Sequence, residues 1–338
     1  MKIGLEIEYW VIDQKGRLTS SKKLAENHGS AEQEFVQPLI EIKTQPHTNI
    51  EELKQDITKK LHSLVQEAEK LNQKIVSLGT PLNSQNIELV PSKRGQIQRK
   101  IIGENLEAAK RVAGTHIHFE KQQTKKQLNA LTALDPAHAL TNSSPHYQGK
   151  KTASSSRNQV YRHKCYKNHP KHGQLWNYTD SVKEWENRIQ KNFQKFLKAA
   201  KNQGINQKQV NKHFKPSNAL WTPVRLRKDF PTIEWRAPDT TKTKNILKLT
   251  KKMKQHLEKP EKVEKPSFNK LQKLTQKATK QGLQENKVKK YLEKQEFNTR
   301  QYQPISPEIK QEKLDINQAR KIRLKYAQKH HKNTKKSI

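Results

Sequence analysis

Gly4-Leu5-Glu6-Ile7-Glu8-Tyr9-Trp10 is the stretch from which the fold of this chain can be worked out. Apolar and acidic residues alternate along it, and a period of two predicts a β-strand with two different faces. Glu6 and Glu8 would project from one face, about 6.5–7 Å apart, while the apolar residues pack on the other. Carboxylates this close repel each other unless the face is open to water or a cation lies between them. For this strand alone, the simpler interpretation is a hydrated sheet face.

Three later segments repeat this alternation, and each places residue types suited to metal or phosphate on one face. A hydrated face of an antiparallel sheet is usually a mixture of Lys, Thr, Ser and Gln, whereas carboxylates and imidazoles dominate here. These groups are the oxygen and nitrogen donors that divalent cations accept. The four strands together therefore predict a shared binding face, to which the later segments contribute Glu41 and Lys43 (38–44), His116 and His118 (113–119), and Glu234 and Arg236 (231–236).

Some of these residues also have simpler explanations. Lone histidines are more often structural than ligands, and this applies to His118. Glu234 and Arg236 are also explained by a cross-strand salt bridge, which does not exclude a role in binding. The choice depends on whether the four segments meet in space.

The polar stretch from Ser143 to Arg162 has little apolar periodicity and two interpretations. One is a disordered surface loop. The other is a substrate-binding loop, in which Arg157 and Arg162 contact a carboxylate or a phosphate. A guanidinium group suits this role because it donates two parallel hydrogen bonds to a planar carboxylate.

Four motifs give the chain a recognisable resemblance: Gly-Leu-Glu-Ile-Glu at 4–8, Gly-Thr-His-Ile-His at 114–118, Asn-Ser-Ser-Pro-x-x-x-Gly at 142–149 and Thr-Ile-Glu-Trp-Arg at 232–236. In this order they resemble the glutamate–cysteine ligase family, type 2, the archaeal and bacterial branch that includes carboxylate–amine ligases. The resemblance covers roughly residues 1–240. It implies an α+β fold similar to that of glutamine synthetase. There a curved, mainly antiparallel sheet forms a funnel for ATP and divalent metals, with helices packed on its outer face.

The strand pattern and the resemblance together lead to a set of candidate site residues. The metal ligands would be Glu6, Glu8, Glu41, His116 and Glu234, which would hold Mg²⁺ or Mn²⁺. The catalytic residues would be Arg236, Glu234 and His116. The family places a histidine that contacts metal or substrate at position 116. A Trp and an Arg similar to Trp221 and Arg225 lie near its site, which makes Arg225 a secondary candidate. The contacts to substrate or ATP would be Arg157, Arg162, Arg225, Lys43 and His118. The family resemblance favours the substrate-loop interpretation for the two arginines of 143–162.

These residues predict an enzyme that joins a carboxylate to an amine at the expense of ATP through an acyl phosphate. Glutamate plus cysteine giving γ-glutamylcysteine, a step of glutathione biosynthesis, is the expected reaction. One alternative is the same chemistry with a different amino acid or amine acceptor. The chain has no Gly-x-x-x-x-Gly-Lys loop, so we expect the nucleotide to be held by metals and side chains of the sheet.

The charge of the chain raises a second alternative. Its 338 residues are 31% hydrophobic and 30% charged, which predicts a modest core, and the formal net charge is +36. Such a balance is typical of proteins that bind nucleic acid or another polyanion. The second alternative is therefore a basic nucleic-acid-binding protein on a degenerate ligase scaffold. Lys far outnumbers Arg, and Gln and Asn are abundant, so a bias of the lineage is an equal explanation. A positive field would also help to capture ATP, itself a polyanion.

The cysteine count and the hydropathy predict the compartment. Cys165 is the only cysteine, so an intrachain disulfide is impossible and a reducing cytoplasm is expected. The sequence shows no signal peptide at its start and no apolar run anywhere that is long enough to cross a membrane, so we expect a soluble cytoplasmic protein without membrane partners. His163, Cys165, His169 and His172 lie close in sequence, but their spacing matches no common zinc module.

The composition of the chain changes from Thr243 onward. We expect a catalytic domain at 1–242 and a basic helical extension at 243–338, packed loosely on it and frayed after about residue 328. The extension holds 27 Lys and Arg against 9 Asp and Glu, and its apolar stripes are thin. Within the catalytic domain, apolar spacings of three and four predict a helix after Asn49 that packs on the sheet, and another from Leu128 to Leu140.

Overall fold

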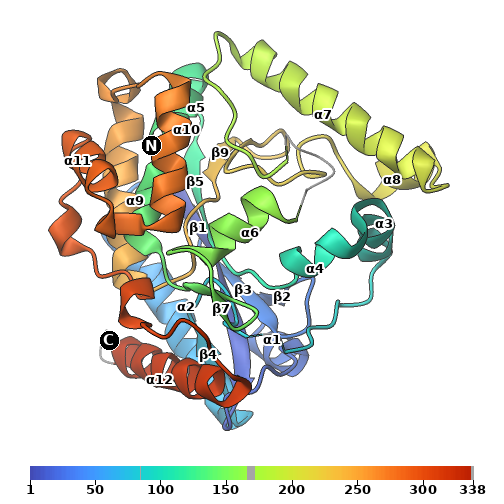
Figure 1. The fold of residues 1–338 in the computed structure, drawn as a ribbon, viewed down its shortest axis with the longest axis vertical. Helices are drawn as coiled ribbons and strands as arrows, with labels where there is room; N and C mark the ends of the chain where they lie inside the picture. The colour runs from blue at the N-terminus through green and yellow to red at the C-terminus, as the bar shows by residue number, and fades with distance from the viewer. Residues whose placement is uncertain (84, 166–171, 336–338) are drawn as a thin grey trace.

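The computed structural model describes residues 1–83, 85–165 and 172–335 as helices surrounding one antiparallel sheet (Figure 1). The sheet has the order β2-β3-β1-β5-β9-β8, with β4 added beside β1. Each strand pair in it is antiparallel. The strands are β1 (Ile3–Asp13), β2 (Ala31–Gln33), β3 (Leu39–Lys43), β4 (Gln73–Val76), β5 (Thr115–Glu120), β8 (Val224–Leu226) and β9 (Thr232–Trp235), and a separate hairpin pairs β6 (His146–Tyr147) with β7 (Lys150–Lys151).

The four strands that alternation predicted are β1, β3, β5 and β9, and they are consecutive neighbours in the sheet. The α+β class and the antiparallel sheet are therefore confirmed. The register places the polar residues opposite one another: Glu6 faces Lys43 on one side and His116 on the other, Glu8 faces Glu41, and His118 faces Glu234. Opposed residues of adjacent strands project from the same face, so one face carries these groups together.

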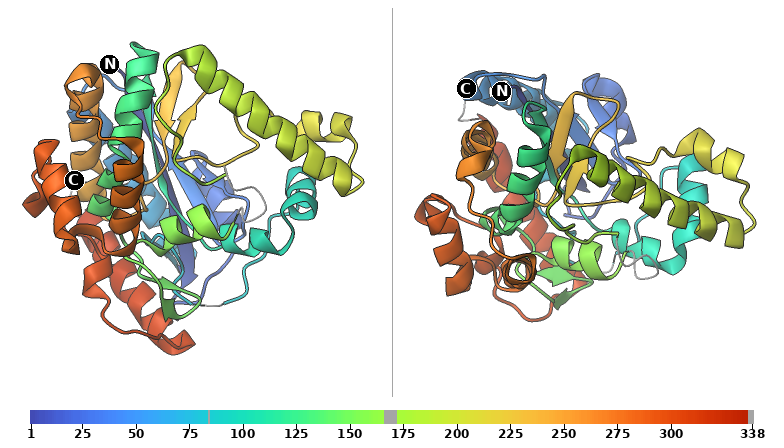
Figure 2. Two further views of the ribbon diagram at one scale, coloured as in Figure 1. Left: turned by 45° about the horizontal axis from the view of Figure 1, so that its top comes forward. Right: turned by 90° about the horizontal axis from the view of Figure 1, so that it is seen from above.

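The helices lie on both sides of this sheet, with the C-terminal helices on one side and α7 on the other (Figure 2). They are α1 (Lys22–His28), α2 (Ile50–Lys70), α3 (Lys93–Ile102), α4 (Leu106–Ala109), α5 (Thr124–Ala133), α6 (Ser156–His163), α7 (Val182–Asn202), α8 (Gln207–His213), α9 (Thr243–Glu258), α10 (Phe268–Lys280), α11 (Asn286–Lys294) and α12 (Ile316–Lys335). Short 3₁₀ helices occupy Gly103–Asn105, Asp135–Thr141, Pro260–Lys262, Gly282–Gln284, Thr299–Gln301 and Ser306–Glu308.

The main core forms where the apolar face of β1 meets α2, α5 and α9. Ile7 and Tyr9 are fully buried in one cluster with residues of all three helices. The predicted helix after Asn49 is confirmed as α2, and the Asn49 side chain caps it by accepting a hydrogen bond from the Glu51 N–H. At about 25 cal/mol per Å² of apolar surface, burying a side chain such as Ile7 stabilises the fold by roughly 2 kcal/mol. This packing holds the strands whose other face carries the polar residues.

The polar face of β1 ends at Trp10, because a second core covers the strand from there on. Trp10 and Ile12 lie in a cluster with Tyr326 and Ala327 of α12. Arg323 of the same helix is fully buried, and its guanidinium donates hydrogen bonds to the carbonyl oxygens of Gly16 (2.9 Å) and Pro81 (2.6 Å) and to Oδ1 of Asn83 (2.8 Å). The last helix of the chain thus closes onto its first strand.

Two predictions between residues 124 and 163 are wrong in detail. The helix expected from Leu128 to Leu140 is α5, which ends at Ala133 and is followed by a 3₁₀ helix. Pro136 explains the break, since it has no N–H to donate to the carbonyl four residues earlier. The polar stretch at 143–162 is not a loop throughout, because it contains the β6–β7 hairpin and α6. Ser155 starts this helix by accepting a hydrogen bond from the Asn158 N–H.

The C-terminal helices pack more tightly than their thin apolar stripes predicted. Ile246, Leu249 and Met253 of α9 are almost completely buried in the main core, and Tyr291 of α11 donates a hydrogen bond to the Ala133 carbonyl oxygen at 2.8 Å. The last helix is continuous to Lys335. A domain boundary at residue 242 stays a prediction. Within the described residues, no helix has the length and apolar character needed to cross a membrane.

Candidate active site

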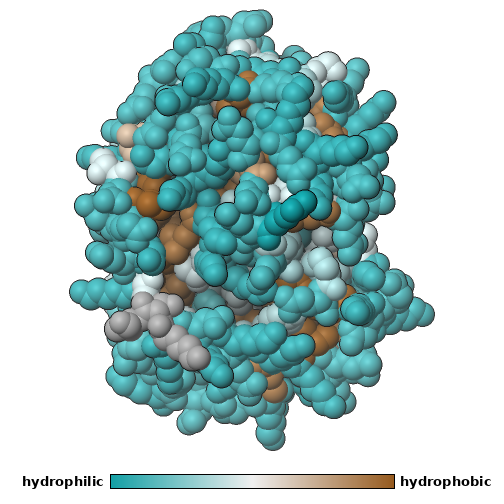
Figure 3. All heavy atoms as spheres, turned by 90° about the vertical axis from the view of Figure 1, so that its left-hand side faces the viewer, coloured by the Kyte–Doolittle hydropathy of each residue, from teal (hydrophilic) through white to brown (hydrophobic). Residues whose placement is uncertain are grey.

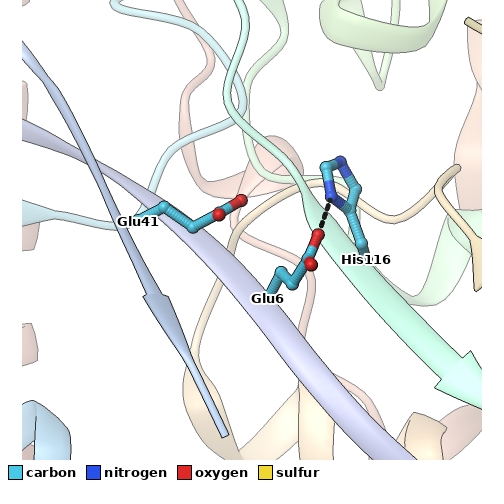
Figure 4. A group of neighbouring side chains, drawn as sticks. All are labelled: Glu6, Glu41 and His116. Atoms are coloured by element: carbon cyan, nitrogen blue, oxygen red, sulfur yellow. Dashed lines mark hydrogen bonds and ion pairs between the residues drawn. The ribbon is translucent and has the colours of Figure 1, made fainter. Parts of the chain in front are cut away.

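Three strands bring carboxylates and an imidazole to one place on the polar face of the sheet. Figure 4 shows Glu41 on β3, Glu6 on β1 and His116 on β5 with their side chains turned toward one another. Nδ1 of His116 lies 3.0 Å from Oε2 of Glu6. One donor atom from each of these three residues lies within 4.8 Å of the other two. The convergence that the sequence pattern predicted for these residues is present.

Two further groups with the same spacing adjoin the first. One consists of Glu6, His118 and Glu234, and the other of Glu8, Glu34 and Glu41. Glu6 and Glu41 each belong to two groups, so the three candidate sites share ligands and form one continuous cluster. We call the seven residues Glu6, Glu8, Glu34, Glu41, His116, His118 and Glu234 the carboxylate cluster.

Glu8 and Glu41 are buried carboxylates of the cluster that lie close to other carboxylates. Burial and the neighbouring Glu34 raise the pKa of Glu8 to about 8. Burial, together with Glu34, Glu6 and Glu8, also raises the pKa of Glu41 well above its usual value. Desolvation and like charges both disfavour the ionised form, which explains these shifts. The Gly114 N–H donates a hydrogen bond to Oε2 of Glu8 at 2.5 Å.

The histidines affect Glu6 differently. Burial opposes its ionisation, but hydrogen bonds from His116 and His118 outweigh burial and lower the pKa of Glu6. Burial and the nearby Arg236 lower the pKa of His116 to about 4, so its imidazole is neutral at neutral pH. A neutral imidazole with a free lone pair is the form that ligates metals.

Glu234 lies at the centre of an arginine cluster formed by Arg225, Arg227 and Arg236. Its side chain is fully buried, and its Oε2 lies 2.5 Å from an Nη of Arg225 and 3.5 Å from Nη1 of Arg227. Nε of Arg236 lies 2.9 Å from Oε1, but the geometry is not that of a hydrogen bond, so Oε1 keeps no hydrogen-bond partner among the described residues. Burial opposes ionisation of Glu234, but Arg225 and Arg236 outweigh it and lower the pKa to about 2.

The remaining predicted contacts lie in different surroundings. Arg157 is buried, and its guanidinium donates to the backbone carbonyl oxygens of Ala237 and Arg236, each at 3.0 Å. Arg162 is buried and pairs with Asp135 at 2.9 Å, which ties α6 to the 3₁₀ helix after α5. Neither arginine is therefore free in the way a substrate loop would need. Lys43 is half-buried at the rim and contacts Glu41 at 3.1 Å and Glu32 at 2.5 Å.

Comparison with known proteins then identifies the family. A family model described as glutamate-cysteine ligase family 2 matches residues 2–312. The chain belongs to this family. The comparison with curated protein sequences gave no match.

Solved structures have the same fold as this member of glutamate-cysteine ligase family 2. A bifunctional glutathione synthetase from Pasteurella multocida matches with a TM-score of 0.62 and 15% identity, over 98% of this chain and 52% of that one. A glutamate–cysteine ligase from Francisella tularensis, in complex with AMP, matches with a TM-score of 0.60 and 14% identity, over 98% of this chain and 88% of that one. The chain thus spans about half the length of the bifunctional enzyme.

The donor set suits the divalent cations that the ligase family implies. Carboxylate oxygens with a minority of imidazole nitrogens are ligands that Mg²⁺ and Mn²⁺ accept. The raised pKa of Glu8 and the buried Oε1 of Glu234 without a hydrogen-bond partner point the same way, because both would be relieved by a cation.

Sequence reasoning missed Glu34 and the contact of Arg227 with Glu234. Glu34 follows β2 directly and belongs to the group with Glu8 and Glu41. A signal was present, since Glu32 and Glu34 are two residues apart and Glu32 pairs with Glu41 in the register. Of the four residues considered for zinc, His169 lies outside the described residues and Cys165 is buried.

Proposed function

We propose that this protein is an ATP-dependent carboxylate–amine ligase that joins glutamate to cysteine and forms γ-glutamylcysteine. The observation that carries the proposal is the carboxylate cluster beside the three arginines, in a chain of glutamate-cysteine ligase family 2. Acidic groups suit metals and guanidinium groups suit phosphates, and a ligase that uses ATP needs both at one place.

The residues of the carboxylate cluster are the proposed metal ligands, with Glu6 and Glu41 shared between sites. Divalent cations, Mg²⁺ or Mn²⁺, would neutralise charge on the phosphate chain of ATP when bound. The protein's own contribution is the arrangement of the donors. The backbone pairing of β3, β1 and β5 fixes their spacing before any ligand arrives.

The first step is transfer of the γ-phosphoryl group of ATP to glutamate. An oxygen of the γ-carboxylate attacks the γ-phosphorus, the bond to the bridging oxygen breaks, and ADP leaves with that electron pair. Arg236 and Arg225 are the residues assigned to stabilise charge on the transferred group. Their side chains retain 14% and 12% exposure, so they lie at the surface of the site, while the buried Glu234 fixes both guanidinium groups.

The second step forms the amide bond. The amine nitrogen of cysteine attacks the acyl carbon, the amine loses a proton, and phosphate leaves with the electrons of the carbon–oxygen bond. Only the pocket around the amine decides the acceptor, so an acceptor other than cysteine is the first alternative. Soluble small molecules are the expected substrates, and the cytoplasm is the expected compartment.

The test is an assay of paired amino acids with ATP and Mg²⁺. The protein is incubated with glutamate and one amine at a time, and ADP and the ligated product are measured by mass spectrometry. We expect ADP and γ-glutamylcysteine in equal amounts with cysteine. A product with another amine and none with cysteine would replace the acceptor but keep the ligase chemistry.

Matched variants separate the ligase from the nucleic-acid alternative. Arg236→Met should lower turnover by about 10²–10³-fold, as expected for loss of a group that stabilises transition-state charge. Glu312→Gln, an exposed residue paired with Lys151, is the control and should leave turnover unchanged. The nucleic-acid alternative predicts no turnover with any pair. It also predicts salt-sensitive binding of nucleic acid that persists when Glu6 and Glu234 are replaced by Gln.

A further inference from the structure

A cavity of about 920 Å³ lies between α2, α9 and α12, and no residue of the carboxylate cluster is among the described residues that line it. Leu61 of α2, Thr243 at the start of α9 and His330 of α12 are among the residues that line it. The ring of His330 lies 5.3 Å from that of Tyr9, whose side chain projects from the apolar face of β1. Because its described lining shares no residue with the carboxylate cluster or the three arginines, this cavity is separate from the candidate active site.

The described residues that line this cavity include no aspartate or glutamate but six cations: Lys242, Lys244, Lys248, Arg300, Lys329 and Lys332. Three of these are partly engaged. Lys242 and Lys329 lie 2.8 Å and 3.8 Å from Glu308, and Lys248 donates to the Gln301 carbonyl oxygen.

Lys244, Arg300 and Lys332 form no ion pair with any carboxylate of the described chain. They come from α9, from the 3₁₀ helix Thr299–Gln301 and from α12, so three separate segments contribute exposed, unpaired positive charge to the wall of one cavity. Like charges brought together cost free energy, and an anion between them removes that cost.

The start of α9 adds to this potential. Its sixteen residues begin at Thr243 in the wall of the cavity, and its first turn has neither an acidic residue nor a side-chain cap. The first N–H groups of a helix have no partner within the helix, and the helix dipole is positive there. This arrangement suits the oxygen atoms of a phosphate.

His330 adds a buried, neutral imidazole ring to the wall of the cavity. Only 7% of this residue is exposed, and its Nε2 has no hydrogen-bond partner among the described residues. Burial and the neighbouring His331 lower the pKa of His330 to about 3, so the ring is neutral and has one N–H to donate.

We infer that this cavity binds a small anion that carries two or more phosphate groups. Three unpaired cations match a chain of phosphates better than a single one, and the volume is that of an ordinary small-molecule site. Figure 3 shows this side of the molecule, where hydrophilic side chains surround hollows in which apolar atoms are visible. Nucleic acid fits less well, because it needs a continuous groove with aromatic residues for its bases. Tyr326 is the single phenol, indole or phenyl ring in the described lining, and its hydroxyl is bound to Glu308.

The test measures binding of inorganic tripolyphosphate by calorimetry, with the full chain and EDTA to remove divalent cations. We expect saturable binding to one site that weakens as salt is raised and is much tighter than binding of orthophosphate. Equal affinity for orthophosphate, or no saturable binding, would overturn the inference. Adding ATP in a separate titration distinguishes the sources: tighter binding than tripolyphosphate indicates a nucleotide, and equal binding a bare phosphate chain.

Variants locate the binding. The double variant Lys244→Glu/Lys332→Glu should weaken the affinity for tripolyphosphate at least about tenfold. Lys195→Glu/Lys198→Glu, on the exposed face of α7, makes the same change of charge on the other side of the sheet and should leave the affinity nearly unchanged. Arg236→Met should also retain binding. Equal losses in the two lysine variants, or loss in Arg236→Met, would show that the anion binds elsewhere.

Discussion

Replacing Glu234 by Gln should destabilise the fold markedly, although it removes a single charge and almost no volume. The carboxylate is fully buried, and the three arginines that surround it lie between 2.5 and 3.5 Å away. Gln keeps an oxygen that can accept one hydrogen bond but takes away the countercharge. Arg225, Arg227 and Arg236 would then face one another with nothing between them to offset their repulsion.

The size of the effect depends on how far the arginine cluster is exposed to solvent. Removing one partner of a fully buried ion pair costs about 3–5 kcal/mol, because the other charge is left uncompensated. The arginine side chains retain 12–17% exposure, so water still solvates them in part. We therefore expect the lower end, about 3 kcal/mol of the free energy of unfolding. The protein should remain folded, since domains are typically stable by about 5–15 kcal/mol.

Urea denaturation followed by tryptophan fluorescence measures this cost. The matched control is Glu312→Gln, an exposed pair with Lys151 that should cost less than about 1 kcal/mol. In an Arg225→Met background the Glu234→Gln change should cost at least about 1 kcal/mol less, because one of the opposed charges is already gone. If Glu234→Gln costs no more than the Glu312 control, the carboxylate does not hold the arginines and the argument fails.

Three other substitutions test separate parts of the structure. Gly114→Ala would press a methyl group against the buried Arg157 guanidinium and should lower the free energy of unfolding, measured in urea, by about 1–3 kcal/mol. Adding Arg157→Met should restore part of this stability, because it removes the group that the methyl contacts. Burial and Lys252 lower the pKa of His256 to about 4 in the folded protein. In the unfolded chain this histidine takes up a proton below about pH 6.5, whereas in the folded protein it does so only below about pH 4. Wild-type stability should therefore fall as pH drops from 6.5 to 4, and in His256→Leu the fall should shrink by up to about 3 kcal/mol while stability at pH 8 changes little. Arg323→Met should lower the free energy of unfolding by about 2–4 kcal/mol and speed hydrogen exchange in α12, because it leaves buried carbonyl oxygens without donors. Unchanged exchange rates in α12 would contradict this.

The sequence was sufficient to predict the sheet around the site because each of its four strands has one polar and one apolar face. Leu5 and Ile7 need a core, so Glu6 and Glu8 must project the other way. The same reasoning applied to His116 and Glu234, and the antiparallel register then brought them together. Side chains that alternate along a strand are specified by local sequence alone, which is why their convergence could be expected.

Other features depend on contacts that no local pattern reveals. The polar segment around Arg157 looks unstructured in sequence, but its hydrogen bonds go to backbone carbonyl oxygens some 80 residues away. The same holds for Arg162, whose partner Asp135 lies on another element. The burial of the C-terminal helices is greater than their thin apolar stripes predicted, because neighbouring helices also cover residues beside those stripes.

The contact between α12 and β1 bears on how the protein is made. Arg323 and Gly16 are 307 positions apart, and Trp10 is buried against residues of the same terminal helix. During translation this apolar part of β1 therefore stays uncovered until the residues of α12 have left the ribosome. A nascent chain halted shortly before Ile316 should accordingly depend on chaperones, because α12 is the element that covers Trp10 and Ile12.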